Sequence, residues 1–356
     1  MENNNKAFDI LKGYKEIVWQ EIKDYLERPV YPQSFKIPNE YSKDINSYWK
    51  IVRDYPERQG KYLRPSLTIM AAEAMGLDSK TTVKTAGAMQ LSEDWILIYD
   101  DFQDRSLFRR GKPTLHKLYG PELAINAGIS LQILIWDMLS DNDSLLGEKK
   151  SFLILKEFSK MLERTSDGQA IEKAWSLQGK TNYTENDWYF IADGKTAYYT
   201  IAGPLRLGAI MANASKKQLE LLSVFGIHLG RCFNLVDDLL DLTSDYRGSG
   251  QKAGGDIVES KVTIPLIHLL KNSKSTDREN LLRIVKKDPD EKSGSEVLWV
   301  IEKMKEYKSL DYAQKLAKEY KNRALSMFEK DLGFLSRPEA REKLRTVIHF
   351  VLNREY

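Results

Sequence analysis

Two acidic patterns of the same form offer the most distinctive chemistry in this chain. Both read Asp-Asp-x-x-Asp, one beginning at Asp100 and the other at Asp237. On an α-helix, positions i and i+4 share a face and position i+1 lies on the adjoining flank, so each pattern presents three carboxylates together. Each pattern follows a strongly apolar stretch, and carboxylates beside buried surface need a compensating cation.

Mg²⁺ is the cation that these carboxylates predict. It takes oxygen ligands and typically combines one or two carboxylates with substrate phosphates and water. One such pattern in a chain with 29% charged residues is most often a solvated helix face, but two identical copies favour a function. We therefore predict a cluster of Mg²⁺ ions that holds a diphosphate between two helices, with six candidate ligands: Asp100, Asp101, Asp104, Asp237, Asp238 and Asp241.

The composition describes a nearly neutral globular chain. The 356 residues are 42% hydrophobic, and 54 basic against 51 acidic residues leave a net charge of +3, without the basic excess of nucleic-acid binders. The one cysteine, Cys232, and four scattered histidines speak against a disulfide framework or a zinc site. We find no signal peptide and no run of about 18 apolar residues, so we expect a cytoplasmic protein without a membrane span.

Helical periodicity dominates the chain and predicts an all-α fold. Apolar residues recur at steps of three and four, as in Leu11, Tyr14, Val18 and Ile22. The sequence predicts helices over 7–27, 66–76, 82–103, 121–140, 151–164, 186–213, 216–242 and 296–330, and little strand. Loops are expected at 141–149, 244–256 and 286–294, and one domain over residues 1–356.

Basic residues lie in short motifs around both acidic patterns. The motifs are Gly60-Lys61-Tyr62-Leu63-Arg64-Pro65, Arg109-Arg110-Gly111-Lys112-Pro113-Thr114, Gly194-Lys195-Thr196, Lys252 with Gly255-Asp256, and Lys261-Val262-Thr263-Ile264-Pro265. Lys and Arg bind diphosphate oxygens through charge-assisted hydrogen bonds, and Arg presents a two-pronged fork. Each motif alone is typical of surface charge, but together they bracket both acidic patterns.

In this order the motifs resemble those of the trans-isoprenyl diphosphate synthases, the polyprenyl synthetase family. The resemblance extends over residues 55–270 by motif. It implies a single-domain antiparallel helical bundle of the isoprenoid synthase type with a central active-site cavity. It also implies a prenyltransferase that condenses isopentenyl diphosphate head-to-tail with an allylic diphosphate, using three Mg²⁺ ions, and a homodimer.

The resemblance assigns a role to each matching residue. Mg²⁺ would link the allylic diphosphate to Asp100, Asp104 and Asp237, with Asp101, Asp238 and Asp241 in support. Further allylic contacts would come from Arg109, Lys195, Lys252 and Lys261, and the isopentenyl diphosphate site would comprise Gly60, Lys61, Arg64 and Arg110. Positions near the reacting carbons are matched by Thr196 and Asn234, and Gln169 matches the family's Gly-Gln pair.

Elementary electrostatics agrees with this chemistry. Diphosphate departs only when its growing negative charge is neutralised by metal ions and fixed cations. The allylic carbocation left behind must be shielded from water, which apolar helix walls provide. In the family the released diphosphate is the expected base, so no histidine is required.

Two positions depart from the family pattern. Glu93 stands where the family often has His or Gln, and a carboxylate there would repel a diphosphate unless it pairs with Lys61, Arg64 or Arg110. We predict that Glu93 pairs with these cations and orients them. Asn234 replaces the commoner Gln and has a shorter reach.

Product length is predicted from the residues one turn before the first acidic pattern. Ile96 lies one turn beneath Asp100, and Trp95 flanks it on the same helix. In the family a bulky residue five positions before the pattern often limits the product, although Trp95 could equally be ordinary core. With the family in view, a short product of C15 to C20 is expected, geranylgeranyl more than farnesyl.

Other functions share parts of this sequence. A class I terpene cyclase or head-to-head condensing enzyme has the same bundle, but cyclases typically carry a mixed Asn/Ser/Glu second metal motif. A non-catalytic subunit usually loses one acidic pattern, and both are intact here. A plain helical scaffold does not explain the order of the motifs, and a longer-chain polyprenyl diphosphate synthase stays an alternative.

Overall fold

The structure is a computed structural model that describes residues 2–27, 29, 31–243 and 253–352. Helices make up almost all of the regular structure in these residues, so the predicted all-α fold is confirmed. The chain divides into two compact units. The first unit comprises Met1–Lys156, Leu207–Asn213 and Ser336–Leu344, and the second comprises Glu157–Arg206, Ala214–Leu335 and Arg345–Tyr356. The expectation of a single domain stays a prediction.

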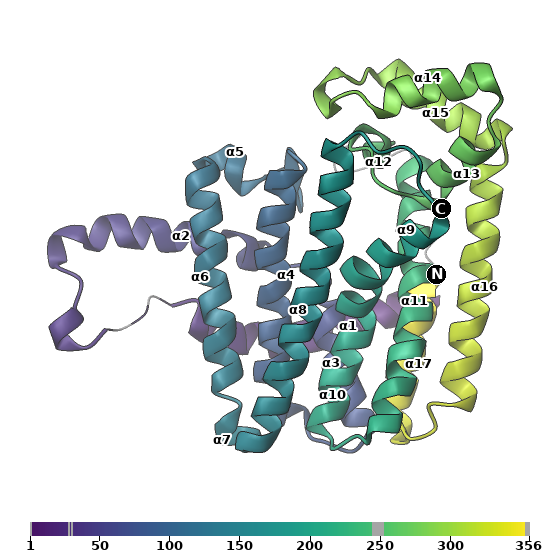
Figure 1. Ribbon diagram of the computed structural model, residues 1–356. Helices are drawn as coiled ribbons and strands as arrows, with labels where there is room; N and C mark the ends of the chain where they lie inside the picture. Colours follow the sequence, from purple (N-terminus) through teal and green to yellow (C-terminus); the bar gives the residue numbers. More distant parts are fainter. Residues whose placement is uncertain (1, 28, 30, 244–252, 353–356) are drawn as a thin grey trace. The chain divides into compact units, whose positions relative to one another are not determined.

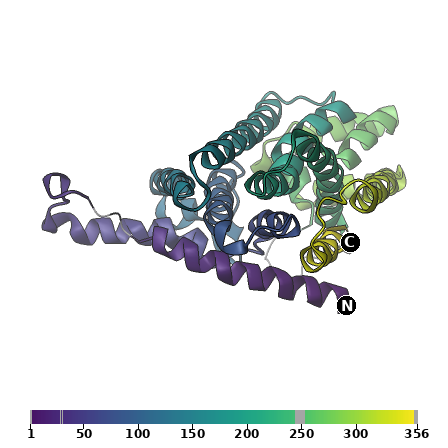
Figure 2. The same ribbon diagram turned by 90° about the horizontal axis from the view of Figure 1, so that it is seen from below.

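Helix α4 (Val83–Gln103) is the central element of the first unit. It packs along α6 (Pro121–Ser140) and α3 (Leu63–Ala74), and α1 (Glu2–Tyr25) runs across α3 and α4 (Figures 1 and 2). Residues 85–92 of α4 are all buried, as expected for a helix enclosed by neighbours, although Thr85, Gln90 and Ser92 among them are polar. The other elements of this unit are η1 (Gln33–Phe35), η2 (Asn39–Tyr41), α2 (Ser42–Arg58), η3 (Ser79–Thr81), β1 (Phe108–Arg109), β2 (Lys112–Pro113), α5 (Leu115–Tyr119) and α7 (Asp143–Leu146).

Helix α11 (Lys216–Thr243) is the central element of the second unit. It packs along η4 (Ala192–Ala202), an 11-residue π-helical segment, and along α16 (Ser309–Lys330) (Figure 1). The remaining elements of this unit are α9 (Glu185–Ile191), α12 (Gly255–Val258), α13 (Ile264–Asn272), α14 (Ser275–Val285), η5 (Pro289–Glu291) and α15 (Gly294–Glu306). Residues of both units form α8 (Glu148–Leu177), α10 (Gly203–Met211) and α17 (Pro338–Leu352).

Local sequence signals explain where several helices begin. Capping boxes start α9, through Thr184 and Asp187, and α15, through Ser293 and Glu296. In each box the hydroxyl and the carboxylate satisfy backbone N–H groups that the first helical turn leaves free. Pro121 starts α6, where its missing N–H costs nothing.

Three sequence predictions about elements were wrong. The predicted helix 296–330 is two helices, α15 and α16, because Lys308 adopts a left-handed φ of 60° between them. The predicted loop 141–149 contains α7 and the start of α8. The predicted set of helices omits α2, α13, α14 and α17. The scarcity of strand is confirmed in the described residues by a two-stranded ribbon, β1–β2.

Two helical stretches are long and apolar enough to cross a membrane, judged by length and composition alone. They are Pro121–Leu146 and Lys216–Thr243, each with 44% of its most apolar window buried inside the protein. Core helices of globular proteins meet the same criterion, so this is weak evidence for a membrane. The absence of a membrane span stays a prediction.

Candidate active site

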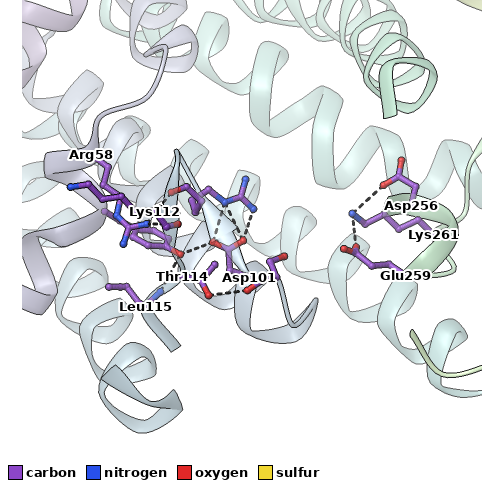
Figure 3. A network of polar contacts seen from close by, with 11 residues as sticks. Arg58, Asp101, Lys112, Thr114, Leu115, Asp256, Glu259 and Lys261 are labelled. Carbon is purple, nitrogen blue, oxygen red and sulfur yellow. Dashed lines mark hydrogen bonds and ion pairs between the residues drawn. The ribbon is translucent and has the colours of Figure 1, made fainter. Parts of the chain in front are cut away.

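The first acidic pattern ends α4, and its three carboxylates have different surroundings. Asp101 is fully buried and accepts hydrogen bonds from Tyr55 Oη at 2.6 Å and from Arg109 Nε at 3.0 Å (Figure 3). Asp100 and Asp104 are only half-buried. The structure therefore gives Asp101 a cation from the protein itself and leaves the other two positions more accessible.

Burial and ion pairing oppose each other at Arg109. Burial by itself lowers the pKa of Arg109, but the hydrogen bond and charge of Asp101 outweigh it and the pKa is raised. Burial, followed by the charge of Asp101, likewise raises the pKa of Tyr55. Asp101 thus lies between a guanidinium and a phenol, and hydrogen bonds join it to both.

Arg58 supports this arrangement and was not among the predicted site residues. It comes from the end of α2 and donates hydrogen bonds to the carbonyl oxygens of Arg109 at 3.0 Å and Pro113 at 2.8 Å (Figure 3). Its Nε also lies 2.5 Å from Asp54, one turn earlier. Arg58 thereby fixes the β1–β2 ribbon that returns Arg109 to Asp101, a long-range contact without a sequence signal.

The predicted isopentenyl diphosphate residues Arg64 and Arg110 lie with two carboxylates. Glu93 Oε2 is 3.0 Å from Arg64 Nη1, and Glu93 Oε1 is 3.8 Å from Arg110 Nη2, so the predicted pairing of Glu93 is confirmed. Asp94 Oδ1 is 2.8 Å from Arg110 Nη1. Lys61, the other predicted cation of this site, is exposed.

Asp94 is the member of this group that sequence reasoning missed. It is 1% exposed and also accepts a hydrogen bond from Gln90, one turn earlier on α4. Burial raises the pKa of Asp94 to about 6, although the charge of Arg110 opposes the rise. A Cβ at Gly60 would stand 2.9 Å from Arg110 Nη2, which explains why glycine occupies that position.

The second unit positions the Gly194-Lys195-Thr196 motif on η4. Lys195 Nζ donates to Glu172 Oε2 of α8 at 3.0 Å, and Thr196 Oγ1 donates to Asn234 Oδ1 of α11 at 2.9 Å. The short amide of Asn234 therefore reaches Thr196. Glu172 was not predicted, although it follows Gln169 by three residues on one face of α8.

The second acidic pattern ends α11, and within the described part of the chain no arginine pairs with Asp238 as Arg109 pairs with Asp101. Asp238 is 8% exposed, and its Oδ2 has no hydrogen-bond partner among the described residues. Burial, then the charges of Asp256 and Asp237, raise its pKa well above the ordinary range. Asp241 accepts hydrogen bonds from the backbone N–H groups of Gly255 and Asp256, each at 3.1 Å, and burial raises its pKa to about 6.

Lys261 lies near this pattern and is held by two acids. Its Nζ is 3.3 Å from Asp256 and 2.7 Å from Glu259 (Figure 3). Lys252, the other predicted cation of this region, lies outside the described residues. Within 2–27, 29, 31–243 and 253–352, no three Asp, Glu, His or Cys side chains gather closely enough to hold a metal ion by themselves.

The donor set of the second pattern nevertheless fits a hard divalent cation. Asp238 offers a buried carboxylate oxygen with no hydrogen-bond partner in the described part of the chain, and the other side chains of the motif that could bind a cation are also carboxylates. Mg²⁺ usually takes few protein ligands and completes its shell with water and phosphate. The carboxylates of the second pattern therefore fit a Mg²⁺ ion that also binds water and phosphate, rather than a site built of protein ligands alone.

The residues predicted to limit the product lie on α4, where Trp95 faces α6. The Trp95 ring makes an edge contact with Tyr99, with centroids 6.2 Å apart. A Cβ at Gly128 of α6 would stand 2.9 Å from Tyr99 and 3.3 Å from Trp95, so α6 approaches both rings closely. Ile96 is half-buried on the same helix.

A family model described as polyprenyl synthetase matches residues 46–304 of the chain. The chain belongs to this family. A short chain isoprenyl diphosphate synthase from Methanothermobacter thermautotrophicus is 29% identical over 352 residues, 99% of each protein. Family membership and this relative confirm the predicted enzyme class: the polyprenyl synthetase is a prenyl diphosphate synthase, and hence a prenyltransferase.

Solved structures agree with the fold of this polyprenyl synthetase. A geranylgeranyl pyrophosphate synthetase from Pyrococcus horikoshii is 26% identical, covers 99% of both chains and has a TM-score of 0.84. A geranylgeranyl pyrophosphate synthase from Corynebacterium glutamicum, complexed with isoprenyl diphosphate and magnesium, has a TM-score of 0.84 over 97% of this chain and 99% of that one. Its identity of 22% supports a shared fold.

Proposed function

We propose that this prenyltransferase condenses isopentenyl diphosphate head-to-tail with an allylic diphosphate and depends on Mg²⁺. The observation that carries the metal dependence is the buried, unpartnered Oδ2 of Asp238 in a group of carboxylates with raised pKa values. A bound cation would stabilise these carboxylates in their charged form. The number of ions in the proposal, three, comes from the family resemblance alone. The magnesium in the complex of the Corynebacterium enzyme supports the choice of metal.

In the first unit, each proposed contact comes from a side chain that is already restrained. Asp100 and Asp104 are the proposed metal ligands of α4, and Asp101 supports them through its bond to Arg109. Arg64 and Arg110 bind isopentenyl diphosphate, together with Lys61 and the backbone at Gly60. Glu93 and Asp94 hold both guanidiniums before substrate arrives, so the two arginine side chains lose little conformational freedom when the diphosphate binds.

In the second unit, lysine side chains are the proposed cations that bind the diphosphate group of the allylic substrate as it leaves. Bound Mg²⁺ would supply charge neutralisation at the leaving group. Asp237, Asp238 and Asp241 are the proposed metal side of this unit. Lys195, Lys252 and Lys261 are the proposed cationic contacts, and carboxylates already hold the ammonium groups of Lys195 and Lys261 in place. Such preorganised charge lowers the barrier because it needs no rearrangement during the reaction.

Thr196 and Asn234 are the proposed polar groups near the reacting carbons. Their mutual hydrogen bond orients the Thr196 hydroxyl within the second unit. Isopentenyl diphosphate attacks the allylic cation, a carbon–carbon bond forms, and one proton leaves to restore the double bond. The released diphosphate is the proposed base, so no side-chain base is required.

We propose a product of C15 to C20, geranylgeranyl more than farnesyl, with Trp95 and Ile96 at the floor of the elongation path. The relatives named short chain and geranylgeranyl synthases support this range. Replacing Trp95 by Ala removes the ring beside Gly128, and the products should then lengthen by one or more C5 additions. Mass analysis of dephosphorylated products tests this, and an unchanged distribution would assign Trp95 to the core.

We also propose that the enzyme is a homodimer of the cytoplasm. Helix α6 carries three large apolar side chains that are each more than two-fifths exposed: Leu123, Ile129 and Ile133. Exposed apolar faces of this kind are typical of subunit interfaces. Light scattering at several concentrations would test the dimer.

The experiment that tests the function supplies purified protein with Mg²⁺, isopentenyl diphosphate and each of dimethylallyl, geranyl and farnesyl diphosphate. We expect a C15 or C20 alcohol after dephosphorylation, and loss of product when a chelator is added. Longer chains would support the alternative of a long-chain synthase. A cyclised hydrocarbon from the allylic substrate alone would indicate a cyclase, and no product with any primer would favour a regulatory subunit.

A further inference from the structure

Asp193 and Arg231 form a doubly hydrogen-bonded ion pair within the second unit. Arg231 Nε and Nη2 each lie 2.6 Å from one carboxylate oxygen of Asp193. The guanidinium also lies 4.3 Å from the ring centre of Tyr189 and donates to the hydroxyl of Tyr320 at 3.0 Å. The two-pronged geometry and the two aromatic contacts make this pair stronger than an ordinary surface salt bridge.

The pair joins the two elements that carry predicted site residues of this unit. Asp193 lies in the first turn of η4, two residues before Lys195, and Arg231 lies on α11, three residues before Asn234. A π-helix is rare and frequently occurs at functional sites. An ion pair at its first turn therefore restrains the register of the residues that follow.

Close packing fixes the distances from η4 to α8 and α11. It does not by itself fix the register of η4 along α11, which the ion pair restrains. A Cβ at Gly168 of α8 would stand 3.1 Å from the backbone N of Lys195. A Cβ at Gly230 of α11 would stand 2.3 Å from Cα of Ala197. These contacts set how near η4 lies to each helix, and the Asp193–Arg231 pair adds a restraint on rotation and sliding along α11.

We propose that the Asp193–Arg231 pair is a positioning device that sets Lys195 and Thr196 for the allylic substrate. Lys195 turns to Glu172 of α8, whereas Thr196 turns to Asn234 of α11. These two adjacent side chains therefore point toward different helices, and which helix each one reaches depends on the register of the π-helical turn. Asp193 and Arg231 act through these residues, so the inference rests on the proposed roles of Lys195 and Thr196.

The test uses Asp193→Asn and Arg231→Lys in the full-length enzyme. Asn keeps the shape of Asp193 without its charge, and Lys keeps the charge of Arg231 without the two-pronged fork. Initial rates are measured with each substrate varied in turn, alongside thermal unfolding. We expect kcat/KM for the allylic diphosphate to fall about ten- to a hundred-fold, as a small misplacement of positioned groups does. The KM for isopentenyl diphosphate should change less than about two-fold, well below the effect of a lost charged contact.

A matched control stands elsewhere in the same unit. Asp277 pairs with Lys303 at 3.1 Å and accepts a hydrogen bond from the Tyr307 hydroxyl at 2.8 Å. The side chains of Asp277 and Lys303 are 23% and 20% exposed, close to 24% and 19% for Asp193 and Arg231. Asp277→Asn should lower thermal stability comparably and leave both kinetic constants near those of the wild type.

The outcomes separate this inference from the proposed function. If Asp193→Asn and Asp277→Asn differ from wild type only in thermal stability, the positioning role is wrong while the prenyltransferase stands. A rise in the KM for isopentenyl diphosphate as large as the loss of kcat/KM for the allylic diphosphate would also overturn the positioning role, because that pattern indicates general disorder. A wild-type enzyme that forms no product would instead remove the proposed function. Should Asp193→Asn fail to fold, the rates of Arg231→Lys decide.

Discussion

The two acidic patterns share one sequence form but differ in how the protein compensates their charge. In the first, Asp101 is buried against the guanidinium of Arg109 and the hydroxyl of Tyr55. In the second, Asp238 is buried near Asp237 and Asp256, and its Oδ2 has no partner among the described residues. The first pattern is therefore paired with an arginine of the protein. In the second, the pKa of Asp238 stays raised, and a bound cation would be needed to stabilise its charged form.

This difference follows from the groups that contact the C-terminal ends of α4 and α11. The β1–β2 ribbon returns an arginine to the end of α4, and Arg58 fixes that ribbon. At the end of α11, backbone N–H groups of α12 donate hydrogen bonds to Asp241, and the charge of Lys261 opposes the rise in its pKa without cancelling it. Opposite charges favour the ionised carboxylate, while burial and neighbouring carboxylates disfavour it. Equal sequence patterns can therefore have unequal affinities for metal.

The largest expected effect is on catalysis and comes from the second pattern. Asp237→Asn removes a proposed metal ligand without changing side-chain volume. We expect kcat to fall about 10²- to 10³-fold, as it does when one preorganised electrostatic contact to a transition state is lost. Initial rates over a Mg²⁺ titration measure this effect. A variant with wild-type kcat at low Mg²⁺ would remove Asp237 from the metal site.

In the first pattern, the corresponding loss should fall on stability. Asp101→Asn leaves the Arg109 guanidinium without its carboxylate and weakens the bond from Tyr55. We expect a loss of about 2 kcal/mol in the free energy of unfolding, the range for a partly buried charged partner. Urea unfolding in the presence of a chelator measures it. Equal midpoints for the variant and the wild type would show that Arg109 contributes little to the fold.

The same substitution in the second pattern should act in the opposite direction. Asp238→Asn removes a buried carboxylate that Asp237 and Asp256 repel. In the chelated protein we expect the midpoint of thermal unfolding to rise, because the neutral amide avoids both burial of charge and repulsion. A lower midpoint would contradict the contrast between the two patterns, since it would indicate that Asp238 is already compensated within the protein.

The sequence predicted the fold class, and it could propose most residues of the candidate site, because their signals are local. Helical periodicity marks α4 and α11, and each acidic pattern lies within a single helix. The pairing of Glu93 could be predicted since a carboxylate among three cations has few alternatives. Arg58 and Glu172 were missed because their partners are distant in sequence, and contacts of that kind depend on packing rather than on spacing.

The smallest expected effect concerns Asp94, which holds Arg110 in the first unit. Its pKa is raised to about 6 by burial, above the ordinary value, so the folded protein binds a proton at Asp94 more tightly than the unfolded chain does. The groups that face Asp94 are Glu93, Arg110, Gln90 and Tyr62. The stability contributed by protonation is complete below the unfolded pKa and is lost as pH rises through about 6.

Asp94→Asn cannot take up this proton, so its stability should vary less with pH than that of the wild type. Between pH 7 and pH 5, we expect the wild type to gain about 1 kcal/mol in the free energy of unfolding relative to the variant. Parallel pH profiles of urea midpoints would show instead that Arg110 keeps Asp94 charged throughout. Arg110 would then stabilise the charge of Asp94 as fully as Arg109 is expected to stabilise that of Asp101. Arginine would in that case neutralise the buried carboxylate both in the first acidic pattern and in the isopentenyl diphosphate site.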